Sequence, residues 1–441
     1  MAETADHYIK ALLDVYPKGV DLSLTRIGRL LSDLGNPHLQ LPPVIHIAGT
    51  NGKGSAGAFC RALLEAAGLR VHVHTSPHLV HVHERYRIGR LNGGHYVDDA
   101  ELLEILQHIT TVNDQQPITV FEIITAAAFV LFARHPADAV ILEVGLGGRF
   151  DATNIIPEPA VSLIMPVALD HQAFLGDTVE QIAFEKAGII KDSTPVVIGF
   201  QAYDGARDVL LRQAEKHKAP VAVYGQDFSA CVEHGRMAVQ SNRGLLDLPR
   251  PRLVGDFQLG NAAAAIEAVY AAGFHLDETT IATAMQKVEW PARMQKLHQG
   301  HLKTLLPQQT DLWLDGGHNP AAAQVTSAAM RLLCQQQNRK LALVCGMIST
   351  KDSNHYLEAF KGLAERVYTV PVHFSEAGVP ADLLAQAARG LGFEAQGFDT
   401  IAGAFTAINA DYATLPAPVV LVSGSLYLAG EVLQQNGTKP V

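Results

Sequence analysis

An α/β fold built on a doubly wound, mostly parallel sheet is what this 441-residue sequence predicts. Short apolar runs typical of strands alternate with segments typical of helices along the first two thirds of the chain. The strand-like runs are continuous in Val, Ile and Leu, as in strands that a parallel sheet buries on both faces. A second block with the same alternation follows near residue 297, so we expect a smaller Rossmann-like α/β domain at the C-terminus.

The expected elements follow one another in order. In the first block, strands are expected at 44–48, 71–75, 139–144, 161–167, 196–200 and 221–224, with helices at 56–67, 121–133 and 206–216. In the second block, strands are expected at 312–314, 341–346, 366–370 and 419–422, with helices at 321–335, 381–391 and 401–411. The predicted domains are therefore residues 1–296 and 297–441, with ligands expected between the two lobes at the carboxyl ends of strands.

Composition narrows the class of protein. Hydrophobic residues make up 48% of the chain and charged residues 18%, which is typical of a globular enzyme. A net charge of −10 argues against nucleic-acid binding. The sequence shows neither a signal-peptide pattern nor an apolar run of about 18 residues, so a cytoplasmic protein without membrane insertion is expected. Its four cysteines form no CxxC pair, which favours reduced thiols.

A glycine-rich loop, Ala48-Gly-Thr-Asn-Gly-Lys-Gly-Ser55, follows the first strand. Its glycines allow backbone N–H groups to point inward, Lys53 can reach the β and γ oxygens of a nucleotide, and Ser55 can serve a magnesium ion or a phosphate. The loop departs from the standard phosphate-loop pattern, because Gly54 separates Lys53 from Ser55. A glycine-rich hairpin with an incidental lysine is the alternative, but the strand before and the helix after favour a phosphate site.

Two oxygen-bearing side chains stand at the ends of the second and third expected strands. Ser76 lies in Thr75-Ser-Pro-His-Leu79, and Glu143 begins Glu143-Val-Gly-Leu-Gly-Gly-Arg149. Parallel strands would bring both to the edge that carries the phosphate loop, where they suit a hard cation. A carboxylate that merely ends a strand is the alternative for Glu143. The glycines after Glu143 also resemble a dinucleotide fingerprint, but a polar loop follows where that motif needs a helix.

Five histidines, His72, His74, His78, His81 and His83, crowd a short stretch of chain. Their alternation would suit a transition-metal site. Both alternating pairs stand between valines and lack a nearby cysteine, so we favour ordinary packed or solvated histidines.

The second domain carries Leu314-Asp-Gly-Gly-His-Asn-Pro320, a junction between a strand and a helix. Asp315 can accept from a ribose or base, and His318 can approach a substrate carboxylate or phosphate. Asn319 as N-cap and Pro320 at the first helical position would explain the junction structurally. That explanation is compatible with a functional one.

Six motifs in this order resemble the folylpolyglutamate synthase/dihydrofolate synthase family of the Mur-ligase superfamily, and its bacterial bifunctional members in particular. The resemblance spans nearly the whole chain. The motifs are Ala48-Gly-Thr-Asn-Gly-Lys-Gly-Ser55, Thr75-Ser-Pro-His-Leu79, Glu143-Val-Gly-Leu-Gly-Gly-Arg149 with Asp151-Ala-Thr-Asn154, Glu185-Lys-Ala-Gly-Ile189, Asp315-Gly-Gly-His-Asn-Pro320 and Gly424-Ser-Leu-Tyr-Leu-Ala-Gly430.

The resemblance implies a Mur-ligase-like P-loop ATPase domain followed by a glutamate-ligase domain. It further implies an ATP-dependent ligase that adds L-glutamate to dihydropteroate and to reduced folates. The γ-phosphate of ATP would pass to the substrate carboxylate, and the amine of glutamate would then attack the acyl phosphate, which releases ADP and phosphate. A monomer that binds small molecules is expected.

The resemblance also assigns residues. Catalytic roles fall on Lys53, Lys186 and His318, and Lys186 matches a carbamylated lysine that would help hold a second Mg²⁺. The first Mg²⁺ would be bound by Ser76, Glu143 and His171. The ATP-binding positions are Thr50, Asn51, Gly52, Lys53, Gly54, Ser55, Asn261, Arg293 and Asp315. The positions for the pterin substrate are Asp21, Leu22, Thr119, Val120, Phe121, Glu122, Phe150, Asp151 and Ala152.

The sequence also leaves two other hypotheses about the function open. One is a ligase of the same superfamily that acts on a different acceptor, such as a peptidoglycan precursor. An acceptor screen would distinguish it from a folate ligase. A nucleotide-dependent switch would bind ATP or GTP without making an amide. Its nucleotide turnover would not require glutamate and a pterin acid.

Overall fold

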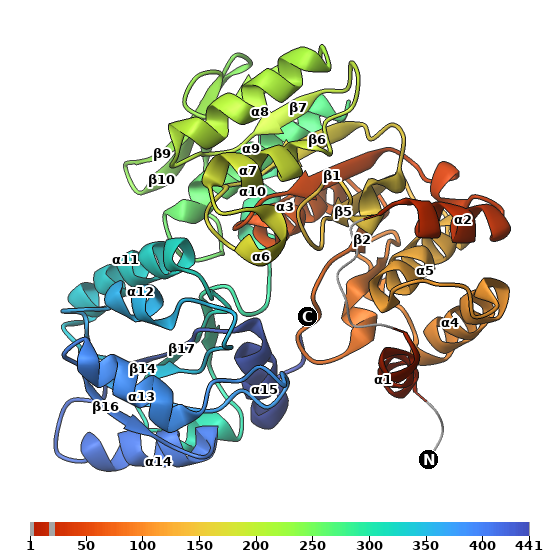
Figure 1. Ribbon diagram of the computed structural model, residues 1–441. Helices are drawn as coiled ribbons and strands as arrows, with labels where there is room; N and C mark the ends of the chain where they lie inside the picture. The colour runs from red at the N-terminus through yellow and green to blue at the C-terminus, as the bar shows by residue number, and fades with distance from the viewer. Residues whose placement is uncertain (1–3, 17–22, 441) are drawn as a thin grey trace. The chain divides into compact units, whose positions relative to one another are not determined.

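The computed structural model describes residues 4–16 and 23–440, which form two compact units (Figure 1). The first unit comprises Met1–Arg252 and Leu259–Val288, and the second comprises Leu253–Gln258 and Glu289–Val441. Each unit has helices around a mostly parallel sheet, so the predicted α/β class is confirmed.

The first unit is built on an eight-stranded sheet in which β5 lies between β2 and β1. All neighbours from β2 to β8 pair in parallel, while β3 and β4 add antiparallel pairs at one edge. In spatial order the strands are β4 (His95–Tyr96), β3 (Tyr86–Ile88), β2 (Val71–His74), β5 (Ala139–Glu143), β1 (Val44–Ala48), β6 (Val161–Ile164), β7 (Val196–Ile198) and β8 (Val221–Val223).

Several of these strands differ from expectation: β3 and β4 were not predicted as strands, and β2, β5, β7 and β8 each end one or two residues earlier than expected. The segment 92–98 reads as a turn in sequence, yet it contains the two-residue edge strand β4. The expected strand 161–167 ends at Ile164, because the next backbone groups serve the glycine-rich loop: Pro166 lacks an N–H, and its carbonyl accepts from Thr50 and Asn51.

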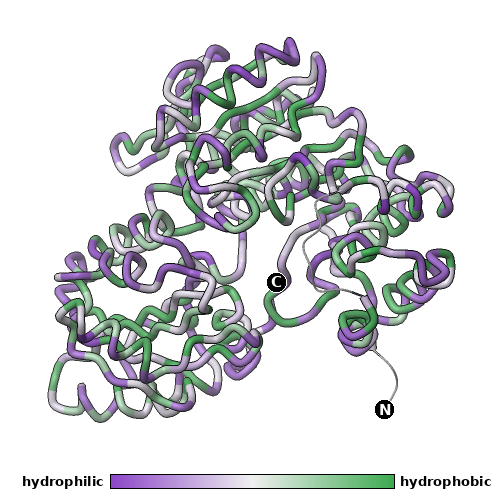
Figure 2. The backbone as a smooth tube through the Cα atoms, in the orientation of Figure 1, coloured by the Kyte–Doolittle hydropathy of each residue, from purple (hydrophilic) through white to green (hydrophobic). Residues whose placement is uncertain are grey.

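Two apolar clusters stand out among the described residues of the first unit. One cluster is formed mainly by α1, α2, α4 and α5 against the sheet, and the other by α7 and α8 with β6 and β7. Along α8, both purple and green segments occur within the helix (Figure 2), and the buried residues Ala206, Val209, Leu210 and Ala214 recur at the spacing of one helix face. The helices are α1 (Ala5–Val15), α2 (Thr25–Asp33), α3 (Lys53–Ala66), α4 (Asp99–Asn113), α5 (Val120–Arg134), α6 (Gln172–Leu175), α7 (Val179–Ala187), α8 (Asp204–Lys216), α9 (Phe257–Ala271) and α10 (Glu278–Lys287), with short 3-10 turns at η1 (Pro37–Leu39), η2 (Val82–Arg85) and η3 (Ala152–Ile155).

A small antiparallel sheet was not foreseen in the sequence. It consists of β9 (Phe228–Glu233), β10 (Arg236–Ser241) and β11 (Gly244–Leu248). Its strands are largely exposed, with polar and glycine-containing turns between them, so they lack the buried apolar runs that marked the parallel strands.

The second unit has a six-stranded sheet, parallel except where β12 pairs with β13. In spatial order its strands are β12 (Gln295–Leu297), β13 (Asp311–Leu314), β17 (Val419–Ser423), β14 (Leu341–Cys345), β15 (Ala364–Thr369) and β16 (Glu394–Gly397). Its helical elements are η4 (Leu302–Leu305), α11 (Pro320–Gln337), α12 (Ser353–Glu358), α13 (Ala381–Gly390), α14 (Ile401–Asp411) and α15 (Leu426–Asn436). Within residues 4–16 and 23–440, no helix combines the length and apolar character needed to cross a bilayer.

Candidate active site

The glycine-rich loop between β1 and α3 is held tightly against the segment that follows β6. Gly49 has φ of 153°, and a Cβ there would lie 2.7 Å from the Cβ of Met165. Thr50 donates its backbone N–H to the Pro166 carbonyl at 2.9 Å and its hydroxyl to the Ala168 carbonyl at 3.0 Å. The loop therefore has one fixed shape that leaves no space for a side chain at Gly49.

The charged and polar groups of the loop lie at the beginning of α3. This helix starts at Lys53, earlier than the expected residue 56, so Lys53 and Ser55 are both in its first turn. The Lys53 ammonium donates to the carbonyl oxygens of Gly49 (3.0 Å) and Thr50 (3.3 Å). An anion at this end of α3 would meet helix N–H groups and a lysine together.

Asn261 of α9 lies against the same loop. Gly52 is left-handed with φ of 82°, and a Cβ there would lie 2.9 Å from the Asn261 side-chain oxygen. The structure thus brings Asn261 to the phosphate loop, although the two are far apart in sequence.

The carboxyl ends of β2 and β5 meet through Thr75, whose hydroxyl donates to the Glu143 carboxylate. Glu143 is buried, with 8% of its surface exposed. The adjacent Ser76 hydroxyl is buried and has no hydrogen-bond partner among the described residues. Glu143 and the residue pair 75–76 are therefore neighbours at one sheet edge, with oxygen donors that suit a hard cation.

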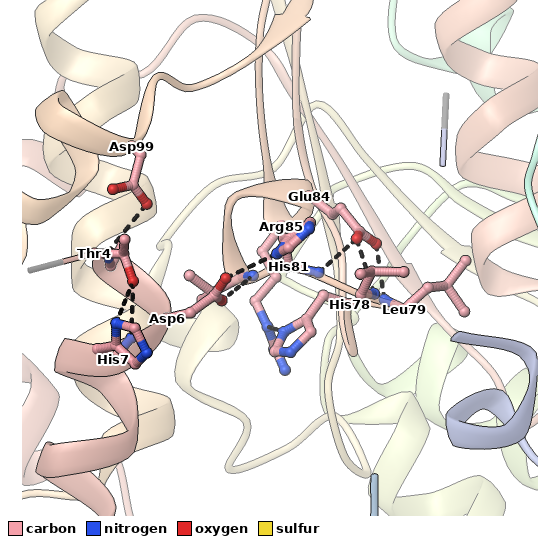
Figure 3. A network of polar contacts seen from close by, with 12 residues as sticks. Thr4, Asp6, His7, His78, Leu79, His81, Glu84, Arg85 and Asp99 are labelled. Atoms are coloured by element: carbon pink, nitrogen blue, oxygen red, sulfur yellow. Dashed lines mark hydrogen bonds and ion pairs between the residues drawn. The ribbon is translucent and has the colours of Figure 1, made fainter. Parts of the chain in front are cut away.

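The segment that follows Ser76 is fastened by two carboxylates (Figure 3). Glu84 accepts from the backbone N–H groups of residues 79–81 at 2.7 to 2.9 Å. Asp6 of α1 accepts from the His81 ring at 2.9 Å and from the next backbone N–H at 2.8 Å. The His81 ring also stacks on His83 at 5.2 Å. These contacts position the segment that carries Ser76.

The other histidines of this stretch have separate packing partners. His72 stacks on Phe132 at 4.7 Å, and His74 donates to the Arg85 carbonyl at 3.0 Å. His78 accepts from the Arg85 guanidinium at 2.9 Å, and burial lowers the pKa of His78 to about 3. Across the part of the chain that the structure describes, no three His, Cys, Asp or Glu side chains are grouped to hold a metal ion.

Lys186 of α7 is a buried amine beside the loop. Only 5% of its surface is exposed, and within the described residues its side chain forms neither an ion pair nor a hydrogen bond. Burial and, next, the charge of Lys53 lower the pKa of Lys186 to about 7, although Asp170 and Asp151 oppose the shift. Lys186, Lys53 and Asp170 are therefore close enough to interact electrostatically.

His171 follows Asp170 and precedes α6. It adopts a left-handed backbone conformation with φ of 53°, and its side chain is 45% exposed. The Asp170 side chain is only 8% exposed, and its carboxylate lies 3.9 Å from the His171 ring. His171 was expected at the site, whereas Asp170 was not, because its single local signal in the sequence is its place after an expected strand.

The residues expected around the pterin substrate divide into structural and accessible groups. Glu122 and Thr119 form a capping box at the start of α5, and Arg26 donates to Glu122 at 3.1 Å. Asp151 accepts from two backbone N–H groups of its own loop and from both the N–H and hydroxyl of Thr153. Both carboxylates are thus largely engaged within the protein.

The apolar members of that set are placed differently. Val120 begins α5, and Ala152 begins η3. Phe121 packs on the glycine loop after β5, because a Cβ at Gly145 would lie 2.4 Å from its ring. Phe150 is 38% exposed. Asp21 and Leu22 lie outside the described residues.

In the second unit, Asp315 organises the junction between β13 and α11. Its carboxylate accepts from the backbone N–H groups of Met294 at 3.0 Å and Gly317 at 2.8 Å. Asn319 caps α11 by accepting from Ala322 at 2.9 Å, and Pro320 is the first helical residue, as expected. The His318 ring donates to the Gly316 carbonyl at 3.1 Å.

Arg293 belongs to the same unit. Its guanidinium donates to the Ala292 carbonyl at 2.9 Å and would lie 2.7 Å from a Cβ at Gly316. Arg293 and Asp315 are therefore grouped around the Gly316 turn.

Two family models match the chain and define its class. The Mur ligase middle domain matches residues 47–269, and the Mur ligase glutamate ligase domain matches residues 293–426. The phosphate loop and the buried polar edge of the first sheet lie within the first match. The protein is thus an ATP-dependent ligase of the Mur type.

Relatives narrow that class further. A dihydrofolate synthase/folylpolyglutamate synthase of Haemophilus influenzae is 37% identical over 350 residues, which cover 77% of each chain. The structure of E. coli FolC in complex with DHPP and ADP has a TM-score of 0.86 and 30% identity, with 98% of this chain and 97% of that chain covered. A bifunctional folylpolyglutamate synthase/dihydrofolate synthase with Mn, AMPPNP and L-glutamate bound has a TM-score of 0.81 and 29% identity, with 97% of each chain covered. The chain belongs to the folylpolyglutamate synthase/dihydrofolate synthase family.

Proposed function

We propose that the protein joins L-glutamate to the carboxylate of dihydropteroate and to the glutamyl carboxylate of reduced folates, with ATP as co-substrate. The acceptor carboxylate attacks the γ-phosphorus of ATP, and ADP leaves. The amine of glutamate then attacks the acyl carbon, phosphate leaves, and the amine loses its proton as the amide forms. The two activities named for the Haemophilus influenzae relative support this proposal, as do the DHPP, nucleotide and L-glutamate named for the solved relatives.

The observation that carries the proposal is the pairing of two lysines at the phosphate loop. Lys53 lies in the first turn of α3, and its charge acts on the buried amine of Lys186. Phosphoryl transfer needs positioned positive charge rather than a protein nucleophile. We assign residues Thr50, Asn51, Gly52, Lys53, Gly54 and Ser55 to the triphosphate, and Asn261, Arg293 and Asp315 to the rest of the nucleotide.

The residues at the sheet edge fit a divalent cation. Glu143 supplies a carboxylate, and the buried Ser76 hydroxyl lacks a partner within the described residues and is free to bind a ligand. With His171, they form the proposed set for one Mg²⁺, and a second Mg²⁺ is assigned to Lys186 in carbamylated form. When bound, the ions would neutralise phosphate charge during transfer.

Lys186 fits carbamylation because the reaction with CO₂ requires a neutral amine. A pKa of about 7 leaves much of Lys186 neutral near neutral pH. The amine nitrogen would bond to the carbon of CO₂ and lose a proton, which yields an anion with two oxygen donors. Protein equilibrated with ¹³C-bicarbonate should show a carbamate carbon signal by NMR, and Lys186→Met should lack it. Wild-type protein without that signal would refute the modification.

The acceptor is assigned to the surface around Phe121 and Phe150, whose rings can support a flat pterin. The neighbouring positions Asp21, Leu22, Thr119, Val120, Glu122, Asp151 and Ala152 complete this proposed site. His318 of the second unit is assigned to the glutamate or phosphate side of the reaction. The two family matches support the functional division into residues 1–296 and 297–441. We also propose that the protein works as a cytoplasmic monomer.

The decisive experiment incubates purified protein with ATP, Mg²⁺, L-glutamate and either dihydropteroate or tetrahydrofolate. Phosphate release should require both glutamate and acceptor, and the products should carry one further glutamate by mass spectrometry. Nucleotide hydrolysis that ignores both additions would support a switch. Turnover only with peptidoglycan-type acceptors would also overturn the folate assignment.

A further inference from the structure

The loop that follows β5 holds an arginine between two exposed aromatic rings. The guanidinium carbon of Arg149 lies 5.0 Å from the ring centre of Phe150 and 5.2 Å from that of Phe184 on α7. Both rings are more than one third exposed. Contacts of this kind hold a guanidinium by its faces and leave its edges accessible.

The backbone of Arg149 is fixed as firmly as its side chain. Its N–H donates to the Glu185 carbonyl at 2.7 Å, and its carbonyl accepts from the Asn154 side chain at 2.9 Å. A Cβ at Gly188 would lie 2.3 Å from the Arg149 Cα, so the two backbones are in direct contact. The position of Arg149 is therefore set before any ligand binds.

Among the residues that the structure describes, no acidic side chain pairs with Arg149. Within the described residues, the Arg149 guanidinium forms neither a hydrogen bond nor an ion pair. Glu185 is the nearby carboxylate: burial raises its pKa, and the charge of Arg149 opposes that shift without a direct contact. A preorganised fork of N–H donors that has no acceptor among the described residues suits a carboxylate ligand.

Arg149 lies next to the groups assigned to the acceptor and to the reaction. Phe150 is its neighbour in sequence. On its other side, a Cβ at Gly148 would lie 3.0 Å from the Lys186 Cα, so this loop packs directly on the backbone of Lys186. Arg149 therefore lies in sequence between Phe150 and the glycine that packs on the Lys186 backbone.

We propose that Arg149 binds the α-carboxylate of the terminal glutamate on a glutamylated acceptor, an inference that rests on the proposed function. Dihydropteroate has a single carboxylate, which is the one that reacts. A glutamylated folate carries an α-carboxylate beside its reacting γ-carboxylate. Arg149 is thus a specificity residue for chain extension, and Phe150 and Phe184 position it.

The test measures kcat and KM for both acceptors at saturating ATP, Mg²⁺ and L-glutamate. Arg149→Gln should raise the KM for tetrahydrofolate roughly 10- to 100-fold, as expected for loss of one charge-assisted contact. The KM for dihydropteroate should change less than about 3-fold, because that acceptor lacks the second carboxylate. Arg149→Lys should recover part of the loss, and Phe184→Leu should show a smaller effect in the same direction. Arg212→Gln, an exposed position on α8, is the matched control.

Calorimetric titration of the same variants with each acceptor gives a readout independent of turnover. Equal losses for both acceptors, or no change for either, would overturn the assignment of Arg149 while leaving the ligase proposal intact. A wild-type protein that uses dihydropteroate but no glutamylated acceptor would likewise overturn the assignment of Arg149 and leave the ligase proposal intact. A wild-type protein inactive with every pteroate acceptor would overturn the proposed function, and the assignment of Arg149 with it.

Discussion

Replacement of Lys186 by methionine should stabilise the protein while abolishing its activity. The lysine is 5% exposed and lacks an ion-pair partner within the described residues. Methionine is similar in length and flexibility but carries no charge, so Lys186→Met removes a buried ammonium with little change in packing. The loss of the proposed metal-binding group should reduce turnover to background.

The size of the stability effect follows from the pKa. Burial, together with the nearby charge of Lys53, lowers the pKa of Lys186 from 10.5 to about 7. This shift of about 3.5 units, at about 1.36 kcal/mol per unit, corresponds to about 5 kcal/mol. Between pH 7 and 10.5 the unfolded chain binds the proton more tightly, so wild-type stability rises with pH in that window. Below pH 7 the full cost is present, and Lys186→Met should gain up to about 5 kcal/mol there.

Urea unfolding from pH 6 to 10 in CO₂-free buffer measures this effect. The advantage of Lys186→Met over wild type should be largest at pH 6 and should shrink steadily above pH 7. Lys216→Met, at the exposed end of α8, is the matched control and should give a pH dependence like that of wild type. Parallel stability profiles for Lys186→Met and wild type would refute the argument, as would a variant that is less stable at pH 6.

Three further substitutions test the site geometry. Thr75→Val removes the hydroxyl that donates to Glu143. The Mg²⁺ concentration for half-maximal activity should therefore rise about 10-fold, and an unchanged Mg²⁺ titration would contradict the proposed cation site. Asp151→Asn leaves one acceptor oxygen where two carboxylate oxygens now accept four hydrogen bonds. The free energy of unfolding in urea should fall by about 2 to 4 kcal/mol. A decrease below about 1 kcal/mol would argue against that network. Gly49→Ala places a Cβ 2.7 Å from Met165 and should weaken binding of a fluorescent ATP analogue by at least about 10-fold, because the loop must shift. Gly68→Ala shares a positive φ but has open space, so equal weakening there would show that steric conflict at Met165 is not the cause.

Much of the fold was predictable because the parallel strands are buried on both faces. The segment 44–48 is a strand over the same residues as expected, since its apolar run ends where glycine begins. The strands β9 to β11 escaped prediction for the opposite reason: their exposed surfaces do not require a continuous apolar pattern. The early start of α3 at Lys53 depends on the left-handed Gly52, whose conformation a sequence pattern does not specify.

The candidate site was predictable to the extent that it follows sheet topology. Ser76 follows β2 and Glu143 ends β5, and parallel order predicted that both would lie at the same edge of the sheet; that the two strands are direct neighbours comes from the structure. The resemblance, rather than local pattern, singled out Lys186 within an ordinary Glu-Lys pair. Its burial and the proximity of Asp170 depend on how α7 packs, which the sequence of α7 alone does not reveal. The contacts of Arg149 with Phe150 and Phe184 also depend on how α7 packs, because they join a loop to that helix. The sequence therefore did not predict them.

The position of β5 has a consequence for how the protein is made. Both sheet partners of β1, which are β5 and β6, lie later in the chain than β2 and β3. During synthesis β2 and β3 can pair early, whereas β1 must wait until residues 139–143 emerge and insert beside it. Because Glu143 is the last residue of that strand, the central sheet and the polar edge beside the phosphate loop would form together. A nascent chain halted before β5 should therefore have neither a folded sheet centre nor a nucleotide site.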